Sequence, residues 1–212
     1  GTAQLNNSGT VSTSGNDVIS VGVSGATGAT IVSDGALTST GNGGLVVGAF
    51  AANGNVNITS GAVSHTGLTG GGILGLSGAG IGALAANGIA TVTTNGLTST
   101  QADGGVGIIA FGQSATVNAA AVTTAGDSAD AIVAIGQDAA NVTLSGTVST
   151  QGFSSTGVTA FADAVTIVNN GSITTTGDDA AGLDLSGATV TVSGPGSIST
   201  SGDFSAGIAG ED

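Results

Sequence analysis

The sequence predicts an all-β fold, a parallel β-helix (β-solenoid) of about eight coils of about 25 residues, with three short strands per coil. Glycine accounts for 41 of the 212 residues and proline for one, so segments of Val, Ile, Thr and Ser alternate with glycine turns. Apolar residues recur in a fixed order along the whole chain. They make up 40% of the residues against 6% charged, the opposite of the composition of a disordered chain.

The repeat is anchored by an aliphatic residue that opens a Ser/Thr-rich strand. Successive anchors are 26, 26, 34, 25, 26, 25 and 25 residues apart. The anchors are Val11, Leu37, Val63, Leu97, Val122, Val148, Ile173 and Ile198.

Two further aliphatic positions accompany each anchor. One lies five or six residues earlier, at Leu5, Ile31, Ile58, Val92, Val117, Val142, Ile167 and Val192. The other follows after ten residues, at Val21, Val47, Ile73, Ile132, Val158, Leu183 and Ile208, and one residue late at Ile108. Around these positions apolar and polar residues alternate, which indicates strands with one buried face. Stacked at the strand spacing of ~4.8 Å, such coils would form continuous aliphatic ladders.

Residues 1–212 are predicted to be one solenoid domain. The 34-residue coil carries an insertion near residues 70–85, where a strand pattern around Ile73 is repeated around Ile81. The chain opens without a signal-peptide pattern, and its repeats continue to Ile208 with no visible cap. We therefore expect a segment of a longer or processed protein.

The charge balance excludes several classes of partner. The chain has no Lys or Arg and a formal net charge of −13, so it lacks the cations that bind nucleic-acid phosphates. The uncharged stretch 68–90 lies inside the repeat register and is rich in glycine, so we expect no membrane insertion of this segment. With no Cys there are no disulfides, which an extracellular location permits.

Residues for catalysis are scarce, and we expect no enzyme, no catalytic residue and no organic cofactor. His65 is the only histidine, in a slot that other coils fill with Ser or Thr. The alternative is a polysaccharide-active β-helix enzyme. Gly177-Asp178-Asp179 and Ser64-His65-Thr66 are similar to two motifs of polygalacturonase-like enzymes, but in reversed order and without the Arg/Lys motif that follows them. Phe50, Phe111 and Phe161 each end a third strand, where core or corner packing is expected.

Acidic and amide residues recur five residues after the anchor, at Asn16, Asn42, Asp127, Asp178 and Asp203. In stacked coils Asp178 and Asp203 would lie one strand spacing apart and repel each other. Calcium bound by Asp127, Asp178 and Asp203 is one interpretation, because Ca²⁺ takes oxygen ligands. The other is an Asx turn, in which the side chain bonds its own backbone.

If the anchor points inward, the residues one and three places later point outward. This rule predicts an interaction face with two ranks of small side chains. Its hydroxyl residues are Ser12, Ser14, Thr38, Thr40, Ser64, Thr66, Thr98, Thr100, Thr123, Ser149, Thr174, Thr176, Ser199 and Ser201, with Ala125 and Gln151 interrupting. A solvated strand face, an adhesive face that pairs with a like face, and an ice-binding plane all fit this pattern.

The coils around residues 165–178 and 196–203 resemble the passenger repeats of Gram-negative autotransporters and related filamentous surface adhesins. The similarity covers nearly all repeats and is best over residues 116–209. It implies a right-handed β-helix on the exterior of the outer membrane, exported through a barrel that this chain lacks. It also implies roles in surface adhesion, biofilm or matrix filaments. The partners would be the protein itself, laterally or end to end, or a cell-surface or matrix ligand. The outward Thr pairs also resemble those of ice-binding β-solenoids.

Overall fold

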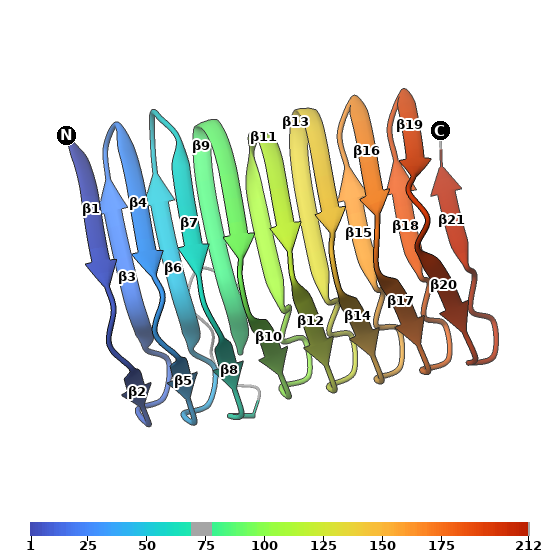
Figure 1. The fold of residues 1–212 in the computed structure, drawn as a ribbon, viewed down its shortest axis with the longest axis horizontal. Coiled ribbons are helices and arrows are strands. Elements are labelled where there is room, and N and C mark those ends of the chain that lie inside the picture. Colours follow the sequence, from blue (N-terminus) through green and yellow to red (C-terminus); the bar gives the residue numbers. More distant parts are fainter. Residues whose placement is uncertain (69–77, 212) are drawn as a thin grey trace.

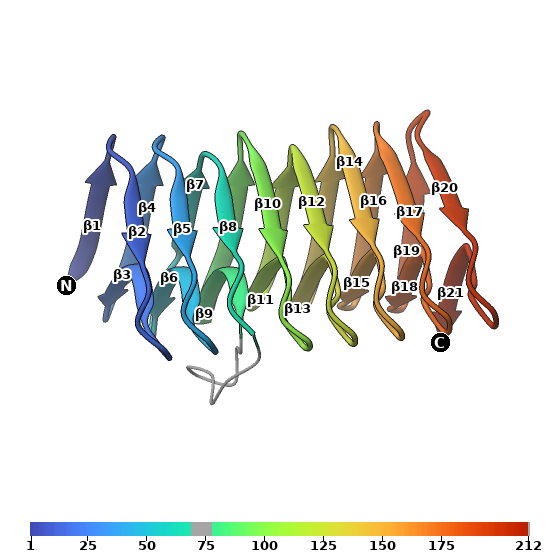
Figure 2. The same cartoon turned by 90° about the horizontal axis from the view of Figure 1, so that it is seen from below.

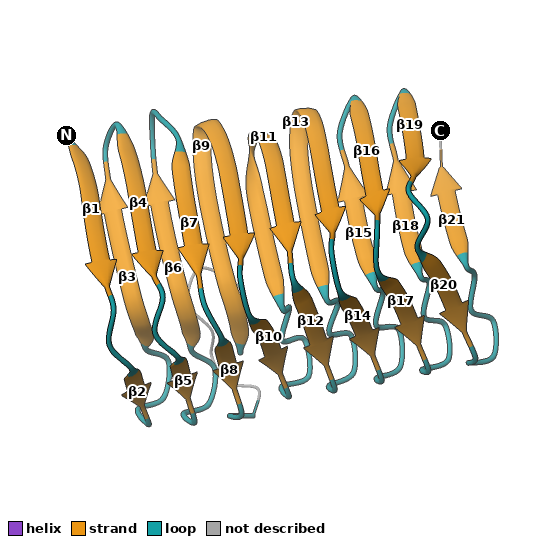
Figure 3. Ribbon diagram, in the orientation of Figure 1, coloured by secondary structure: helices purple, strands orange, loops and turns teal. Residues whose placement is uncertain are grey.

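The computed structural model describes residues 1–68 and 78–211, which form a rod of stacked β coils with no helix among them (Figure 3). Its 21 strands form one sheet of 13 strands and one of eight, and every strand pair is parallel. Each strand pairs with the strands one coil before and one coil after it, as in a β-solenoid of about eight turns with roughly 26-residue spacing. The predicted fold class is confirmed.

Each coil contributes one strand segment to each of three faces. Face 1 comprises β1 (Thr2–Asn7), β4 (Gly28–Ser33), β7 (Val56–Ser60), the second parts of β9 (Ala79–Thr94), β11 (Ile108–Ala119) and β13 (Ile132–Leu144), β16 (Ala164–Asn169) and β19 (Thr189–Ser193). Face 2 comprises β2 (Val11–Thr13), β5 (Leu37–Ser39), β8 (Val63–His65), β10 (Leu97–Thr100), β12 (Ala121–Thr124), β14 (Thr147–Thr150), β17 (Ser172–Thr175) and β20 (Ser197–Thr200). Face 3 comprises β3 (Ile19–Gly25), β6 (Leu45–Ala51), the first parts of β9, β11 and β13, β15 (Val158–Phe161), β18 (Leu183–Ser186) and β21 (Ile208–Glu211). We number the coils 1 to 8 from β2 to β20.

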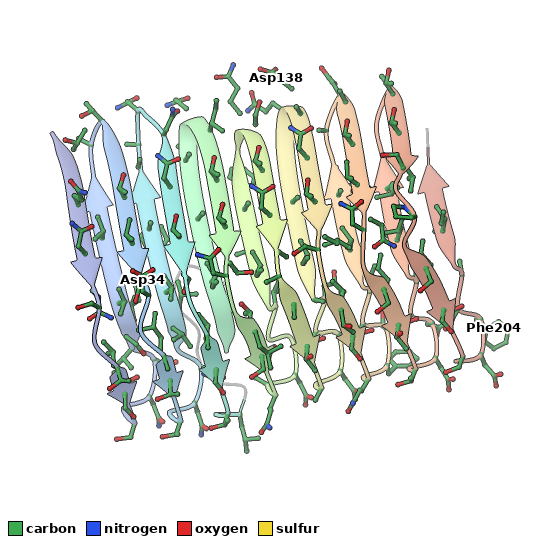
Figure 4. All side chains as sticks on the ribbon, viewed as in Figure 1. Asp34, Asp138 and Phe204 are labelled. Atoms are coloured by element: carbon green, nitrogen blue, oxygen red, sulfur yellow. The ribbon has the colours of Figure 1, made fainter. Side chains whose placement is uncertain are left out.

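The winding of the coils is right-handed. In Figure 1 the strands of face 1 run downward in front and those of face 3 run upward behind, while the chain advances from left to right. Figure 2 views the rod from below, with the strands of face 2 in front. The side chains labelled in Figure 4 mark the three corners: Asp34 lies between faces 1 and 2, Phe204 between faces 2 and 3, and Asp138 between faces 3 and 1.

The interior is built from the aliphatic ladders that the sequence predicts. The face 1 ladder from Leu5 to Val192 is fully in register, and its members in coils 2 to 7 are at most 1% exposed. In the face 3 ladder Ile81, not Ile73, pairs with Val47 and Ile108. Ile73 lies outside the described residues. The regular strand therefore resumes at Ala79, and the extra residues of coil 3 fall between β8 and β9.

The anchor of coil 4 is Thr98 and not Leu97. Thr98 pairs with Val63 and Val122 and is fully buried, whereas Leu97 is 47% exposed. Leu97 is more hydrophobic than Thr98, so the sequence pattern favoured it as the anchor, but Leu97 lies one residue before the inward position. With Thr98 as the anchor, Ile108 follows after ten residues, as its counterparts do in the other coils.

Candidate functional site: the outward columns of faces 1 and 2

The central outward column of face 2 carries a hydroxyl group in every coil. We call it the hydroxyl column; its members are Ser12, Thr38, Ser64, Ser99, Thr123, Ser149, Thr174 and Ser199. Strong strand formers surround it, and the buried anchors below hold its side chains outward. Within the column the Ser99 hydroxyl donates to Ser64 Oγ at 3.3 Å. The column is an unbroken row of small donors and acceptors along the full rod.

The outward direction predicted for two residues of the interaction face is wrong. Thr98 and Thr100 are 0% and 1% exposed and point into the core. The one-residue slip of the anchor in coil 4 exchanges the two faces of β10, because side chains alternate along a strand. Ser99 and Gln101 take the outward places instead. Ser99 thus replaces Thr98 as the coil 4 member of the hydroxyl column.

The second outward rank is less uniform than the hydroxyl column. Hydrogen bonds between adjacent coils place its members in register: Ser14, Thr40, Thr66, Gln101, Ala125, Gln151, Thr176 and Ser201. All of them are exposed. Hydroxyls occupy the two ends of this rank, whereas amide and methyl side chains occupy the middle.

Inward of the second rank lies a buried polar column, which we call the inner column. In coils 4 to 7 its threonine hydroxyls donate to a backbone carbonyl five residues later, for example Thr100 to Gly105 at 2.6 Å and Thr150 to Ser155 at 2.7 Å. Thr124 and Thr175 make the equivalent bonds. These hydroxyls satisfy their hydrogen-bonding capacity while closing the turn between faces 2 and 3.

In coils 2 and 3 the inner column is occupied by Ser39 and His65, and neither has a hydrogen-bond partner. Both are 0% exposed, and the two ring nitrogens of His65 are buried with the Ser39 hydroxyl. Burial lowers the pKa of His65, and the nearby backbone of Gly41 opposes this shift in part. The neutral form of the imidazole is therefore favoured.

The turn between faces 2 and 3 stacks side-chain oxygens on backbone amides, and we call this stack the turn ladder. Asn16 Oδ1 accepts from the Asn42 N–H at 2.9 Å, and Asp178 Oδ1 from the Asp203 N–H at 2.8 Å. Asn42, Asp103 and Asp127 bond the next coil in the same way. The predicted Asx turn is thus replaced by a bond between coils. Asp103 belongs to the ladder too, five residues after the corrected anchor Thr98.

The three residues considered for calcium occupy this ladder, with Asp178 and Asp203 in consecutive coils and Asp127 two coils before Asp178. Phe153 stands between Asp127 and Asp178, and its N–H donates to Asp127 Oδ1 at 2.8 Å. In residues 1–68 and 78–211 no three His, Asp or Glu side chains gather as they would around a metal ion. Calcium at Asp127, Asp178 and Asp203 stays a prediction.

Asp130 is a carboxylate with an altered environment at the same turn. Its Oδ1 accepts from the Thr156 N–H and its Oδ2 from the Thr159 hydroxyl, both at 2.8 Å. Burial raises the pKa of Asp130, the two hydrogen bonds oppose that rise, and the carboxylate of Asp184 adds to it. Both oxygens are engaged in joining coil 5 to coil 6, which indicates a structural role.

Face 1 carries a second polar array that the sequence reasoning did not single out. Its outward column is Gln4, Thr30, Asn57, Thr91, Thr116, Asn141, Thr166 and Thr191. Two residues further along, Thr59, Thr93, Asn118 and Thr143 continue the pattern in coils 3 to 6. The alternation of Thr with inward Val in these strands, as in Thr189–Ser193, is the sequence signal that predicts this outward column.

No protein-family model matches this chain, and searches of the curated proteins and of the solved structures return no match. Within the part of the chain that the structure describes, no helix is long and apolar enough to cross a membrane.

Proposed function

We propose that this chain is a non-enzymatic structural and adhesive rod that associates with like surfaces through the hydroxyl column of face 2. The observation that supports the proposal is the presence of a Ser or Thr at all eight positions of that column. Strand spacing of ~4.8 Å repeats these hydroxyls at the same interval as the backbone of any partner β-solenoid. Two such columns can therefore exchange hydrogen bonds over many coils.

The surroundings of the column favour a polar, uncharged contact. Its neighbours in the second rank are hydroxyl, amide or methyl side chains, and none is ionised. Individual bonds between such groups are weak in water, with a net value of about 1 kcal/mol each. A repeated row compensates by adding many bonds between the same two rods. We place the rod on an extracellular surface, as the resemblance to autotransporter passengers and filamentous adhesins implies, with itself or a cell-surface or matrix ligand as partner.

End-to-end contact is a second route of self-association in this proposal. In coil 8 the inward residues Val190, Val192 and Ile208 are 43%, 39% and 55% exposed. A further coil of the same pattern, whether from the same chain or from a second copy, would cover them and pair with β19, β20 and β21.

The test compares two triple variants that place the same charges on different faces of the same coils. Ser64→Glu, Thr123→Glu and Thr174→Glu alter face 2 in coils 3, 5 and 7. Asn57→Glu, Thr116→Glu and Thr166→Glu are the matched control on face 1. We expect the face 2 variant to lose lateral association and surface adhesion by at least about tenfold, because repulsion repeats in each altered coil. Equal adhesion by both variants would rule out the hydroxyl column as the contact.

Ice binding is the second candidate function, and the outward array of face 1 favours it. Thr91 with Thr93 and Thr116 with Asn118 present paired polar groups on face 1, where β4 and β16 have six residues against three in β5 and four in β17 of face 2. The same variants test this function with their roles reversed. The face 1 variant would abolish thermal hysteresis and ice shaping, and the face 2 variant would keep both. A parent protein without thermal hysteresis ends this candidate.

A further inference from the structure

Face 3 exposes an apolar column beside its corner with face 1. The column consists of Phe50, Leu84, Phe111, Ile135 and Phe161 in five successive coils. The three phenylalanines lie at the ends of the third strands, as the sequence predicts, but they point outward and not into the core. Phe111 is 42% and Phe161 36% exposed. We call this the aromatic column.

A groove of about 680 Å³ follows the N-terminal half of the aromatic column. Phe50, Leu84 and Phe111 line it together with small residues such as Ala52 and Ala86. No charged residue lines the groove. A partner that enters it therefore replaces water on an apolar surface without desolvating an ion.

The column has the same order of residue classes when it is read from either end. Reading along the rod gives Ser24, Phe50, Leu84, Phe111, Ile135, Phe161 and Ser186. Aromatic and aliphatic residues alternate symmetrically about Phe111, and a serine follows at each end. Under a two-fold axis through Phe111 each residue of the column therefore meets a residue of its own class in the second copy, and two-fold symmetry is the usual symmetry of homodimers.

The charges of the rod select the orientation of a second copy. Residues 35–102 contain no Asp or Glu, and only Asp17 and Asp34 of the 13 acidic residues precede Asp103. Two parallel copies would place their acidic halves side by side. Antiparallel copies centred on Phe111 place each acidic half beside the nearly uncharged half of the partner, which lowers the repulsion.

The outward column next to the aromatic column favours the antiparallel orientation for the same reason, at one pair of positions. It contains Gly22 in coil 1 and Asp184 in coil 7. In an antiparallel pair Asp184 lies opposite Gly22 of the second copy, whereas in a parallel pair it lies opposite another Asp184. The uncharged glycine end therefore suits the acidic end only when one copy is reversed.

We propose that the aromatic column is the interface of an antiparallel homodimer whose two-fold axis passes through Phe111. Phe111 then meets its own copy, Leu84 meets Ile135, and Phe50 meets Phe161. Equal coil spacing in both rods keeps all five positions in register. This pairing goes beyond the proposed function, because it uses face 3 and leaves faces 1 and 2 of both rods open for lateral contact.

The first experiment is sedimentation velocity of the full chain over a concentration series. We expect a monomer–dimer equilibrium, which Phe111→Asp weakens by about tenfold or more because it places two carboxylates on the axis. Phe153→Asp is the matched control, since Phe153 is a 53% exposed phenylalanine in a turn away from the column. Thermal melting of both variants checks that the outward substitutions leave the fold intact. A parent chain that stays monomeric at every concentration, or a Phe111→Asp variant that dimerises as the parent does, overturns the proposal.

The second experiment determines orientation with single cysteines, since the chain has none of its own. In the antiparallel pair Ser24→Cys of one copy lies near Ser186→Cys of the other. A mixture of the two variants is expected to form a mixed disulfide, and each variant alone is not. Cross-linking of Ser186→Cys with itself would show a parallel pair and refute the proposal. The face 2 triple variant is expected to dimerise normally, so failure of the proposed adhesion and failure of this interface are distinguishable.

Discussion

Coils 2 and 3 differ from coils 4 to 7 in what faces the inner end of the face 2 strand. In the later coils a threonine hydroxyl reaches a backbone carbonyl of its own turn, as Thr150 reaches Ser155. In the earlier coils Ser39 and His65 occupy the same inner column, and their polar atoms are buried without a partner. The two regions share the register of their face 2 strands but not this bond.

The comparison shows how a repeat tolerates polar groups in its interior. A hydroxyl inside the coil adds stability where the turn aims a carbonyl at it, and it costs desolvation where the turn does not. Ser60 and Thr98 are further buried hydroxyls without partners, and they lie in coils 3 and 4. The unpartnered groups thus collect around the enlarged coil, whereas the uninterrupted coils beyond it are satisfied.

The largest effect is expected at a feature that both regions share, the glycine that opens the turn between faces 2 and 3 in every coil except coil 4, where Ala102 takes its place. A Cβ at Gly41 or Gly152 would overlap the backbone carbonyl of the preceding coil, at Gly15 or Gly126. We expect Gly41→Ala and Gly152→Ala each to lower the free energy of unfolding by about 3 kcal/mol or more, measured by denaturant unfolding. Gly104→Ala is the control, because its Cβ meets nothing within 4 Å and only its φ of 67° opposes a side chain. That change should cost about 1 kcal/mol. A tolerated Gly152→Ala would show that the coils can separate locally.

The inner column should separate the two regions directly. Thr150→Val keeps the shape of the side chain but removes the bond to Ser155, and we expect a loss of about 1–3 kcal/mol. Ser39→Ala removes a hydroxyl that has no partner and should be neutral or stabilising. Urea unfolding of both variants measures the difference. If Ser39→Ala destabilises as much as Thr150→Val does, the contrast between the regions is wrong.

Acid should destabilise the early region through His65. The pKa of His65 is lowered by burial in the folded state, so the unfolded chain binds its proton more readily. The stability that the neutral imidazole contributes is complete above its unfolded pKa of about 6.5 and declines as the pH falls below it. We expect the melting temperature to drop between pH 8 and pH 5, and His65→Thr to flatten this dependence.

Asp130 provides the opposite pH signal in the later region. Its folded pKa is raised, so its contribution is complete below the ordinary value of 3.8 and is lost as the pH rises through the folded value. Asp130→Asn removes that component and should leave the response of His65 unchanged. If the melting temperature of the His65→Thr variant still drops between pH 8 and pH 5, the acid sensitivity belongs to another group.

The smallest effect is expected in the turn ladder. Asp127→Asn retains the oxygen that accepts from the Phe153 N–H, so melting should change little, whereas Asp127→Ala should cost about 1 kcal/mol. Adding Ca²⁺ to the parent protein tests the remaining interpretation of Asp127, Asp178 and Asp203. A calcium-dependent rise in melting temperature that Asp178→Asn removes would establish a site there.

Most of the fold could be predicted from the sequence, because three aliphatic ladders and glycine turns recur in nearly every coil. In coil 4 the predicted anchor was one residue too early, because Leu97 is more apolar than Thr98 but lies outside the ladder. The late arrival of Ile108 was the signal of that slip. The turn ladder depends on which backbone group stands one coil away. The inner column depends on where the turn of the same coil places a carbonyl. The spacing along one strand contains neither kind of information. The outward direction of Phe111 was missed for a related reason, since an apolar residue at a strand end fits either side of a corner.

The turn ladder also gives the rod a direction of growth. Each of the five bonds of the ladder joins a side-chain oxygen of one coil to the backbone N–H of the next coil along the chain. A completed coil therefore presents hydrogen-bond acceptors to the residues that follow it, whereas a coil added before it must supply these acceptors itself. Folding that begins at the N-terminal end meets a ready template at each step. A chain that emerges gradually from a narrow exit could use this polarity to wind itself, one coil after another.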